Sequence, residues 1–204
     1  QAQGVEDRLE CWTNPAALTD RNTGRVFFFY ALSEGIVKEG LNTQRYTRTF
    51  YRYSDDEGAS WSDRIEISHL LTAQAGGAPN RGPDGDWIKD INGFPCDFIG
   101  RAFFMPGPGH GLQLHSGRLV MQFWCRTALG TLEGEEVPVE ERKYGIRLLY
   151  SDDGGDTWID ADPSKRVLLG TGGADWPVEE CSAFMAESIP ARKRGWPSWC
   201  CRWR

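Results

Sequence analysis

The sequence lacks the features of a membrane-spanning or a helical protein. None of its apolar runs reaches the roughly 18 residues that a membrane-crossing helix needs. Helical patterning is nearly absent, and Pro138 to Lys143 is the one moderately helix-like stretch. Residues 1–10 contain neither a basic segment nor an apolar run, so no export signal is visible. An all-β protein without a membrane span is therefore expected.

The six cysteines show no spacing that suits a metal site or a disulfide framework. There is no Cys-x-x-Cys pair and no Cys/His spacing typical of zinc ligands. Six thiols are also too sparse to staple a chain of 204 residues. We therefore expect buried free thiols with at most one bridge, no metal site and no cofactor. The cysteines are Cys11, Cys96, Cys125, Cys181, Cys200 and Cys201.

The charge balance disfavours a polyanion as the main partner. The chain carries 29 acidic and 23 basic residues, a formal net charge of −6. A nucleic-acid backbone or an anionic membrane surface would be repelled by such a chain. A small anionic ligand stays possible, because it responds to a few local arginines and not to the net charge.

Short aromatic and β-branched runs alternate with turn residues along the chain. Hydrophobic residues make up 40% of the chain and aromatic residues 12%, which is enough for a sizeable core. Two polar segments, Thr72 to Cys96 and Ala128 to Arg142, are typical of surface loops. The runs bounded by Gly, Asp, Asn or Pro predict strands at Val26 to Leu32, Thr49 to Tyr53, Arg64 to Ile67, Arg118 to Trp124 and Gly145 to Tyr150.

An internal repeat indicates the architecture. Tyr53 to Trp61 and Tyr150 to Trp158 share the pattern Tyr-Ser-Asp-Asp-x-Gly-x-[Ser/Thr]-Trp, and their serines, Ser54 and Ser151, lie 97 residues apart. Each copy follows a predicted strand and precedes another, as the turn of a hairpin would.

The residue types of the repeat suit a turn that satisfies its own polar groups. The second aspartates can accept backbone N–H groups of their own turn, the glycines can adopt positive φ, and the tryptophans can fold back over the hairpin. We interpret the motif as structural; the alternative is that Asp56 or Asp153 is a catalytic residue or a calcium ligand. The motif residues are Ser54, Asp56, Gly58, Trp61, Ser151, Asp153, Gly155 and Trp158.

The two turns resemble the Asp-box, a repeat of sialidases and of several other β-propellers. A more specific segment is Gly-Pro-Gly-His-Gly-Leu-Gln-Leu at Gly107 to Leu114, which closely resembles a sialidase segment. Asn14-Pro15-Ala16 and Glu180-Cys181 agree with the same family in order and spacing. The resemblance covers about Cys11 to Met185. It implies an incomplete sialidase-type β-propeller, about three of six four-stranded blades, over residues 1–187.

The resemblance also implies roles for single residues. Glu180 matches the glutamate that acts as base toward a tyrosine nucleophile, although neighbouring Glu179 could shift the register and Glu180 could be an ordinary strand-end residue. Asn14 and Glu39 match positions that face the sugar. Trp124 replaces an aromatic residue of the pocket, and it could equally be part of the core. His110 would support the loop and take no part in catalysis.

The function that the resemblance implies is retaining exo-α-sialidase activity on sialylated glycoproteins, glycolipids and oligosaccharides. The family's Arg-Ile-Pro arginine and aspartate are not found before Cys11, and its two further arginines and nucleophilic tyrosine are not found after Glu180. We therefore expect the chain alone to be inactive. A non-catalytic carbohydrate-binding propeller is the alternative, and a scaffold for protein partners is a third possibility. The compartment is open, with a secreted or extracytoplasmic location slightly favoured.

Residues 188–204 depart from the propeller pattern. They are rich in Arg, Trp, Pro, Gly and Cys, which favours coding sequence read out of frame over a designed basic-aromatic tail. An incomplete ring of blades also leaves sheet faces unpaired, so we expect association or aggregation of the chain.

Overall fold

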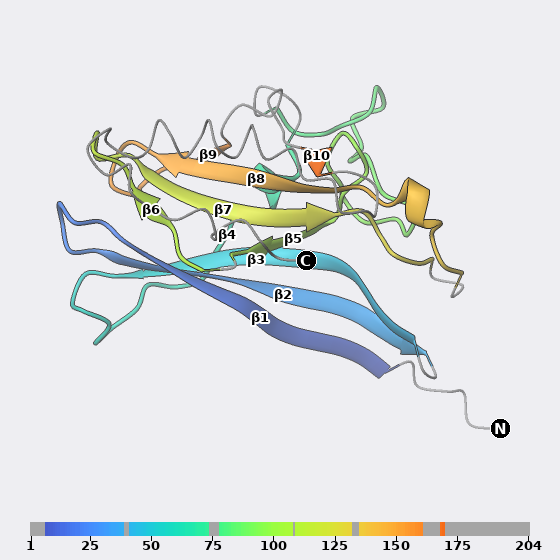
Figure 1. Ribbon diagram of the computed structural model, residues 1–204, viewed down its shortest axis with the longest axis horizontal. Helices are drawn as coiled ribbons and strands as arrows, with labels where there is room; N and C mark the ends of the chain where they lie inside the picture. The colour runs from blue at the N-terminus through green and yellow to red at the C-terminus, as the bar shows by residue number, and fades with distance from the viewer. Residues whose placement is uncertain are drawn as a thin grey trace, which may run out of the picture.

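Two antiparallel sheets stack face to face in the computed structural model of the protein (Figure 1). The first sheet is a meander of β1 (Asp7–Thr19), β2 (Val26–Lys38), β3 (Leu41–Ser54) and β4 (Ile65–Glu66), paired in that order. The structure describes residues 7–38, 41–73, 78–107, 109–131, 135–160 and 168–169.

The second sheet repeats this plan with its outer strands interrupted. β7 (Leu119–Arg126) and β8 (Tyr144–Ser151) form its centre. Two short strands pair with β7 and two pair with β8 on the opposite edge. These short strands are β5 (Phe103–Pro106), β6 (Leu112–Gln113), β9 (Ile159–Asp160) and β10 (Leu168–Leu169).

The all-β prediction is confirmed over the described residues, and each predicted strand lies in or overlaps an observed one. The helix-like stretch at Pro138 to Lys143 contains only one 3₁₀ turn, Val139–Glu141. A four-residue helix that the sequence did not predict, α1 (Ser68–Leu71), follows β4. Two stacked meanders are neighbouring blades of an incomplete propeller; a third expected blade would lie outside the described residues.

An aromatic layer between the two sheets forms the main core. Phe27 and Phe29 of β2 are fully buried, as are Met121 and Phe123 of β7. Trp158 of the second repeat is only 6% exposed, and its ring meets Phe29 edge-on with centroids 5.2 Å apart. Such edge-to-face pairs add stabilisation beyond the burial of apolar area. The second repeat is therefore part of the packing between sheets as well as a hairpin turn.

Gly155 permits the closest approach within this layer. Its φ is +89°, and a Cβ at this position would lie only 2.0 Å from the Phe27 ring. Glycine is thus required twice, for the left-handed backbone and for the missing side chain.

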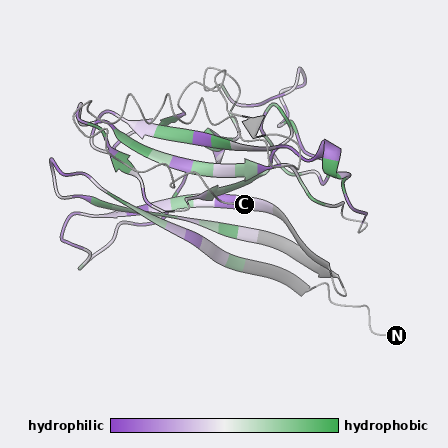
Figure 2. Cartoon of the chain, in the orientation of Figure 1, coloured by the Kyte–Doolittle hydropathy of each residue, from purple (hydrophilic) through white to green (hydrophobic). Residues whose placement is uncertain are grey.

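A buried ion cluster links the second sheet to α1. The Arg101 guanidinium donates to Asp97 over 2.8 Å (Nε to Oδ2), and both side chains are fully buried. Arg147 of β8 pairs with Asp160 and lies 3.7 Å from Asp97, and it also donates to the backbone carbonyl of Leu71 at the end of α1. Figure 2 shows β8 as largely hydrophobic with a hydrophilic interruption. The two charges of each sign compensate one another, as burial requires.

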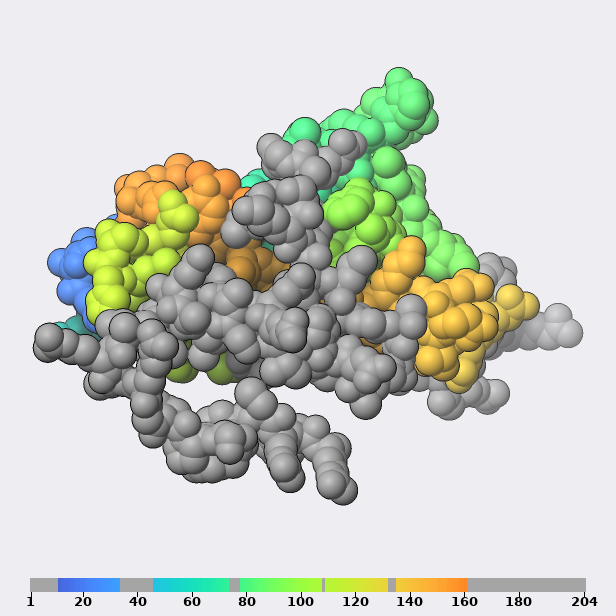
Figure 3. Space-filling view, turned by 45° about the horizontal axis from the view of Figure 1, so that its top comes forward, coloured from blue at the N-terminus to red at the C-terminus, as the bar shows by residue number. Residues whose placement is uncertain are grey.

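The surface-loop prediction for Thr72 to Cys96 is confirmed for most of the described residues of this segment, which projects from the body of the molecule (Figure 3). Asn80 and Cys96 are exceptions at 1% exposed each, and the buried Asn80 amide donates to the Cys96 carbonyl. Among the described thiols, Cys96 and Cys125 are buried and free as expected. Cys11 of β1 is free but exposed, so the expectation of a buried thiol is wrong there.

Replacing Gly155 by alanine should destabilise the protein strongly. We expect a loss of about 3 kcal/mol or more in unfolding free energy, because left-handed strain adds to overpacking against Phe27. Gly58 is the matched control: its φ is +90°, but a Cβ there would meet nothing closer than 3.6 Å. Gly58→Ala should cost only about 1–2 kcal/mol. Equal losses for the two variants in urea unfolding would contradict a tight Phe27 contact.

Candidate functional site

The first strand of the first sheet carries a bulge at Asn14. The register between β1 and β2 shifts between Thr13 and Ala16, and Asn14 has a φ of +52°. A left-handed asparagine is tolerated more easily than most residues, but it still marks a local backbone constraint. The Thr13 hydroxyl donates to Asn14 Oδ1 over 2.8 Å. This bond orients the half-buried amide through its oxygen, and it does not use the two N–H donors of Nδ2.

The Gly-Pro-Gly-His segment of the second sheet lies against the strand that carries this bulge. It connects β5 to β6, with φ of +82° at Gly107 and +104° at Gly109. Gly111 donates its backbone N–H to the Ala17 carbonyl over 2.8 Å, and a Cβ on Gly111 would come within 2.9 Å of Leu18. The glycines thus let this loop dock on β1, and they bring Ala17 and Gly111, which are 94 residues apart in sequence, to one place.

His110 is exposed and its ring turns toward its own backbone. Nδ1 lies 2.8 Å from the Gly111 carbonyl oxygen, and because a carbonyl only accepts, Nδ1 carries the proton. His110 also forms an isolated bridge with Ala17 through its backbone. These contacts give it a part in the loop's own geometry.

Trp124 is half-buried in a small separate cluster. Its ring lies 5.3 Å from that of Phe103, and it packs with Ala31 and Met105. Glu39 and Glu180, the other residues assigned to the sugar and to catalysis, lie outside the described residues. The structure therefore places the Gly107–Gly111 loop against Ala16 to Leu18, just after Asn14 in the same strand, and Trp124 in a separate apolar cluster.

The two Asp-box turns have matching hydrogen bonds. Asp56 accepts the backbone N–H of Ser60 over 2.8 Å and its hydroxyl over 2.6 Å, and Ser54 donates to Asp56 over 2.8 Å. These donors, with the Ser60 hydroxyl the strongest, lower the pKa of Asp56 to about 2.

The second turn repeats this pattern. Asp153 accepts the hydroxyl and the backbone N–H of Thr157, and Ser151 donates to it over 2.7 Å. These contacts, led by the Thr157 hydroxyl, lower the pKa of Asp153 to about 2. Both carboxylates are thus occupied by their own turns.

An arginine precedes β2 in the first sheet and β7 in the second, and each contacts the Asp-box turn of its own sheet. These two arginines belong to the structural repeat, although the sequence pattern did not include them. Arg25 pairs with Asp55 of the first turn at 2.7 Å and stacks on Tyr53, with 4.4 Å from Cζ to the ring centroid. Arg118 makes the equivalent contacts with Asp152 and Tyr150, at 2.7 Å and 4.2 Å. A Gly-Arg dipeptide opening each strand is the signal that could have revealed them.

Arg25 makes one further contact, and no equivalent contact of Arg118 is found among the described residues. Its Nη1 lies 3.0 Å from Asp156 Oδ1 of the second turn, so one guanidinium joins the two Asp-boxes. Both carboxylates are well exposed, which limits the stabilisation from these pairs.

Within the described residues, no group of three or more His, Cys, Asp or Glu side chains is arranged to hold a metal ion. The helices in that part of the chain are all too short or too polar to cross a membrane.

The fold and the repeated turn define an incomplete β-propeller of the Asp-box class. No protein-family model matches the sequence. The chain is 29% identical over 180 residues to human Sialidase-3, covering 83% of this chain and 37% of that protein. Mouse Sialidase-3 is 29% identical over 199 residues, or 89% of this chain and 41% of the relative. The solved structure of Hadza microbial sialidase Hz136 matches 77% of this chain and 25% of its own, with 21% identity and a TM-score of 0.48.

The chain therefore resembles a part of the sialidase sequence. It spans about two-fifths of the length of the curated relatives named above.

The lowered pKa of Asp56 and Asp153 should make stability depend on acid. A carboxyl with a folded pKa near 2 and an unfolded pKa of about 3.9 contributes stability above about pH 4, and this contribution is lost as the pH falls through 2. The free energy of unfolding should therefore decline from pH 4 to pH 2, measured by urea unfolding. Asp153→Asn should flatten this decline, whereas Asp86→Asn, in an exposed loop, should not. An unchanged slope in Asp153→Asn would show that the turn does not bind its carboxylate as described.

Proposed function

We propose that this chain is part of a retaining exo-α-sialidase and supplies one wall of its sialic-acid site. The observation that carries the proposal is the docking of the Gly107–Gly111 loop on β1, where Gly111 bonds to Ala17, three residues after Asn14. It joins two blades where the sialidase resemblance puts sugar-facing residues.

Asn14 would bind a polar group of the sugar. Since its Oδ1 accepts the Thr13 hydroxyl, the Nδ2 group is the free end of the amide, and it can donate to a hydroxyl or carboxylate oxygen. The bulge fixes the backbone, so the amide is positioned before the sugar arrives. Glu39 would accept hydroxyl groups, and the exposed part of Trp124 would contact the apolar glycerol or N-acyl portions.

Glu180 would act as the base in the covalent step. A phenol has an ordinary pKa near 10 and attacks poorly unless a carboxylate takes its proton. A tyrosine nucleophile suits a sugar whose anomeric carbon already bears a carboxylate, since an anionic aspartate would be repelled there; sialidases are an exception to the two-carboxylate rule for this reason. The tyrosine and the arginines that clamp the substrate carboxylate would come from sequence not matched in this chain.

A carbohydrate-binding propeller without turnover is the second candidate. It is favoured by one observation: the chain retains the positions assigned to sugar contact, Asn14 and Trp124, while Glu180 is the one residue matched to the family's chemistry. The two candidates differ in whether a longer form of the protein releases an aglycone.

Activity should depend on Glu180 in the longer protein that contains this chain together with the missing arginines and tyrosine. We expect release of a fluorescent aglycone from an α-sialoside, and a roughly 10²–10⁴-fold fall in kcat for Glu180→Gln, as for loss of a general base. Glu179→Gln is the matched neighbour and should keep most of the activity. Full activity in Glu180→Gln with loss in Glu179→Gln would move the base by one residue.

The 204-residue chain alone should release no aglycone in the same assay. Turnover by the chain alone would contradict the assignment of the nucleophile and the clamp to other segments. A longer protein that binds sialyllactose in a titration but never cleaves the sialoside would support the carbohydrate-binding alternative.

A further inference from the structure

Gln113 is the glutamine of the Gly-Pro-Gly-His-Gly-Leu-Gln-Leu segment, and its side chain bonds to the turn between β1 and β2. Its oxygen accepts the Arg21 backbone N–H over 2.8 Å and the Arg21 Nε–H over 3.1 Å. Its Nε2 donates to Asp20 Oδ1 over 2.6 Å and to the Gly117 carbonyl over 3.2 Å. Both ends of the amide are thus used in full, since a side-chain amide has two acceptor lone pairs and two N–H donors.

The β1–β2 turn presents these partners in a fixed arrangement. Asp20 is 2% exposed, and its carboxylate also accepts the Asn22 backbone N–H over 2.9 Å and the Thr23 hydroxyl over 2.8 Å. Burial opposes ionisation, but the donors from Asn22, Thr23 and Gln113 outweigh it and lower the pKa of Asp20. The carboxylate is therefore ionised at neutral pH, and its bond with Gln113 is charge-assisted.

β6 needs such a contact because its backbone pairing is short. It has two residues, Leu112 and Gln113, and both pair with β7 of the same sheet. The bond from Gly111 to Ala17 of the first sheet comes just before β6, and the bonds of Gln113 to the β1–β2 turn come at its end. The segment is therefore tied to the first sheet on both sides of β6.

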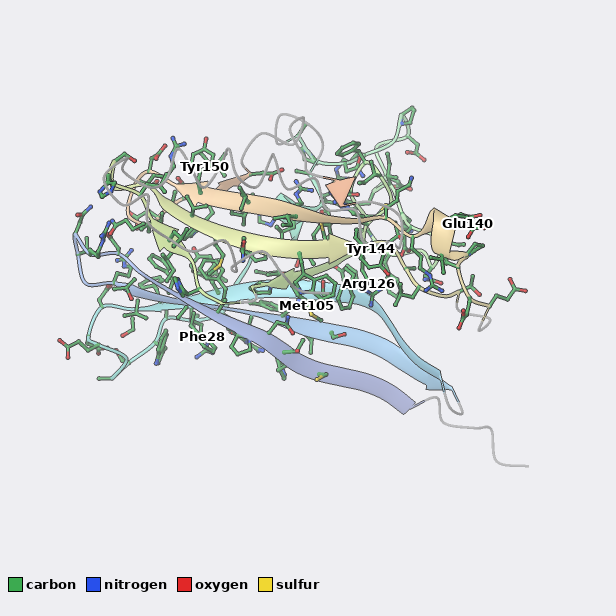
Figure 4. All side chains as sticks on the ribbon, in the orientation of Figure 1. Phe28, Met105, Arg126, Glu140, Tyr144 and Tyr150 are labelled. Atoms are coloured by element: carbon green, nitrogen blue, oxygen red, sulfur yellow. The ribbon has the colours of Figure 1, made fainter. Side chains whose placement is uncertain are left out.

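The Gln113 contacts lie at the Asp-box end of the sheets. Figure 4 shows Tyr150, just before the second Asp-box, at one end of β8 and Tyr144 at the other, and β6 lies at the Tyr150 end. Asn14 lies six residues before Asp20 along β1, which is roughly 15–20 Å at the rise of a strand. Gln113 is thus placed to act on a sugar at Asn14 through the loop and not by contact.

The geometry requires an amide at this position. An oxygen must face the Arg21 N–H groups and a donor must face the Asp20 carboxylate, and both must come from one group. A glutamate of the same length would place a second carboxylate against Asp20, and an alanine would remove the donor from it. Substitutions at Gln113 can therefore test the contact directly.

We propose that Gln113 is a positioning residue of the sialic-acid site: by bonding to Asp20 and Arg21 it holds the Gly107–Gly111 loop on β1. This inference rests on the proposed function, in which that loop is part of the wall of the site. Glycine loses more conformational freedom on ordering than any other residue, and the loop contains three glycines. A side chain that fixes the end of the loop therefore restricts the segment with the most freedom to lose.

Hydrogen exchange in the 204-residue chain tests the contact without any need for activity. The Gly111 amide, which donates to Ala17, should exchange about tenfold faster in Gln113→Ala than in the unmodified chain. The Phe123 amide, in the centre of the second sheet, should keep its protection, which shows that the fold persists. His115→Ala, at an exposed position in the turn that follows β6, is the matched control and should leave the exchange at Gly111 unchanged.

Gln113→Glu gives a readout that loss of packing alone would not give. The new carboxylate would face Asp20, so the loop should be released at neutral pH, and a proton shared between the two carboxylates should restore the contact in acid. The excess exchange at Gly111 over the unmodified chain should therefore shrink between about pH 7 and about pH 5. An excess that does not change over this range would contradict a contact between Gln113 and Asp20.

Kinetics of the longer protein that contains this chain test the effect on the site. Gln113→Ala should raise KM for the α-sialoside about tenfold and change kcat less than about threefold, because a loosened wall weakens binding of the sugar in the ground state and the transition state alike. A merely destabilising change would instead lower the folded fraction, and so the apparent kcat, and leave KM unchanged.

The outcomes separate this role from the proposed function. Unchanged exchange at Gly111 in Gln113→Ala, or an unchanged KM in an active enzyme, would overturn the positioning role and leave the sialidase proposal standing. Faster exchange at Phe123 as well as at Gly111 would also overturn it, because Gln113 would then support the whole fold. A longer protein that neither binds nor cleaves the sialoside would overturn the proposed function, and the positioning role with it, whatever the exchange rates.

Discussion

The packing of aromatic rings between the two sheets is the interaction on which the rest of the structure depends. Phe27 lies against Gly155, and Trp158 meets Phe27 and Phe29 edge-on. This layer sets the separation of the sheets, and the buried cluster of Asp97, Arg101, Arg147 and Asp160 bonds to the Leu71 carbonyl at the end of α1. A residue deep in one sheet thus determines how a turn of the other can fold.

The candidate site is a consequence of that separation. The Gly107–Gly111 loop reaches the bulged strand only because the sheets are close, and it then bonds to the Ala17 backbone. Asn14 owes its position to the bulge and to Thr13, which are local, whereas the loop owes its place against Ala16 and Ala17 to the stacking, which is not. Binding geometry and core packing are therefore coupled at this point of β1.

Local features could be predicted from the sequence, and long-range partners could not. Strand positions followed from β-branched and aromatic runs between turn residues, and the Asp-box hydrogen bonds followed from serine and aspartate at fixed offsets within one turn. The burial of Arg147 could not be foreseen, because its partners come from α1, from the loop before β5 and from β9. The same holds for Trp158, whose neighbours lie on a strand more than a hundred residues earlier. The roles assigned to Glu39, Glu180 and Trp124 rest on resemblance and remain predictions.

The Asp-box turns and the buried Arg147 cluster differ in whether duplication of a blade can copy them intact. Each Asp-box carboxylate is satisfied by donors from its own turn, so a duplicated blade carries that turn intact into any setting. The Arg147 cluster draws on four separate segments, and a copied blade would bring a buried charge without its counterions. Gene duplication can therefore multiply the turn freely, while each new blade boundary has to evolve its own buried polar contacts.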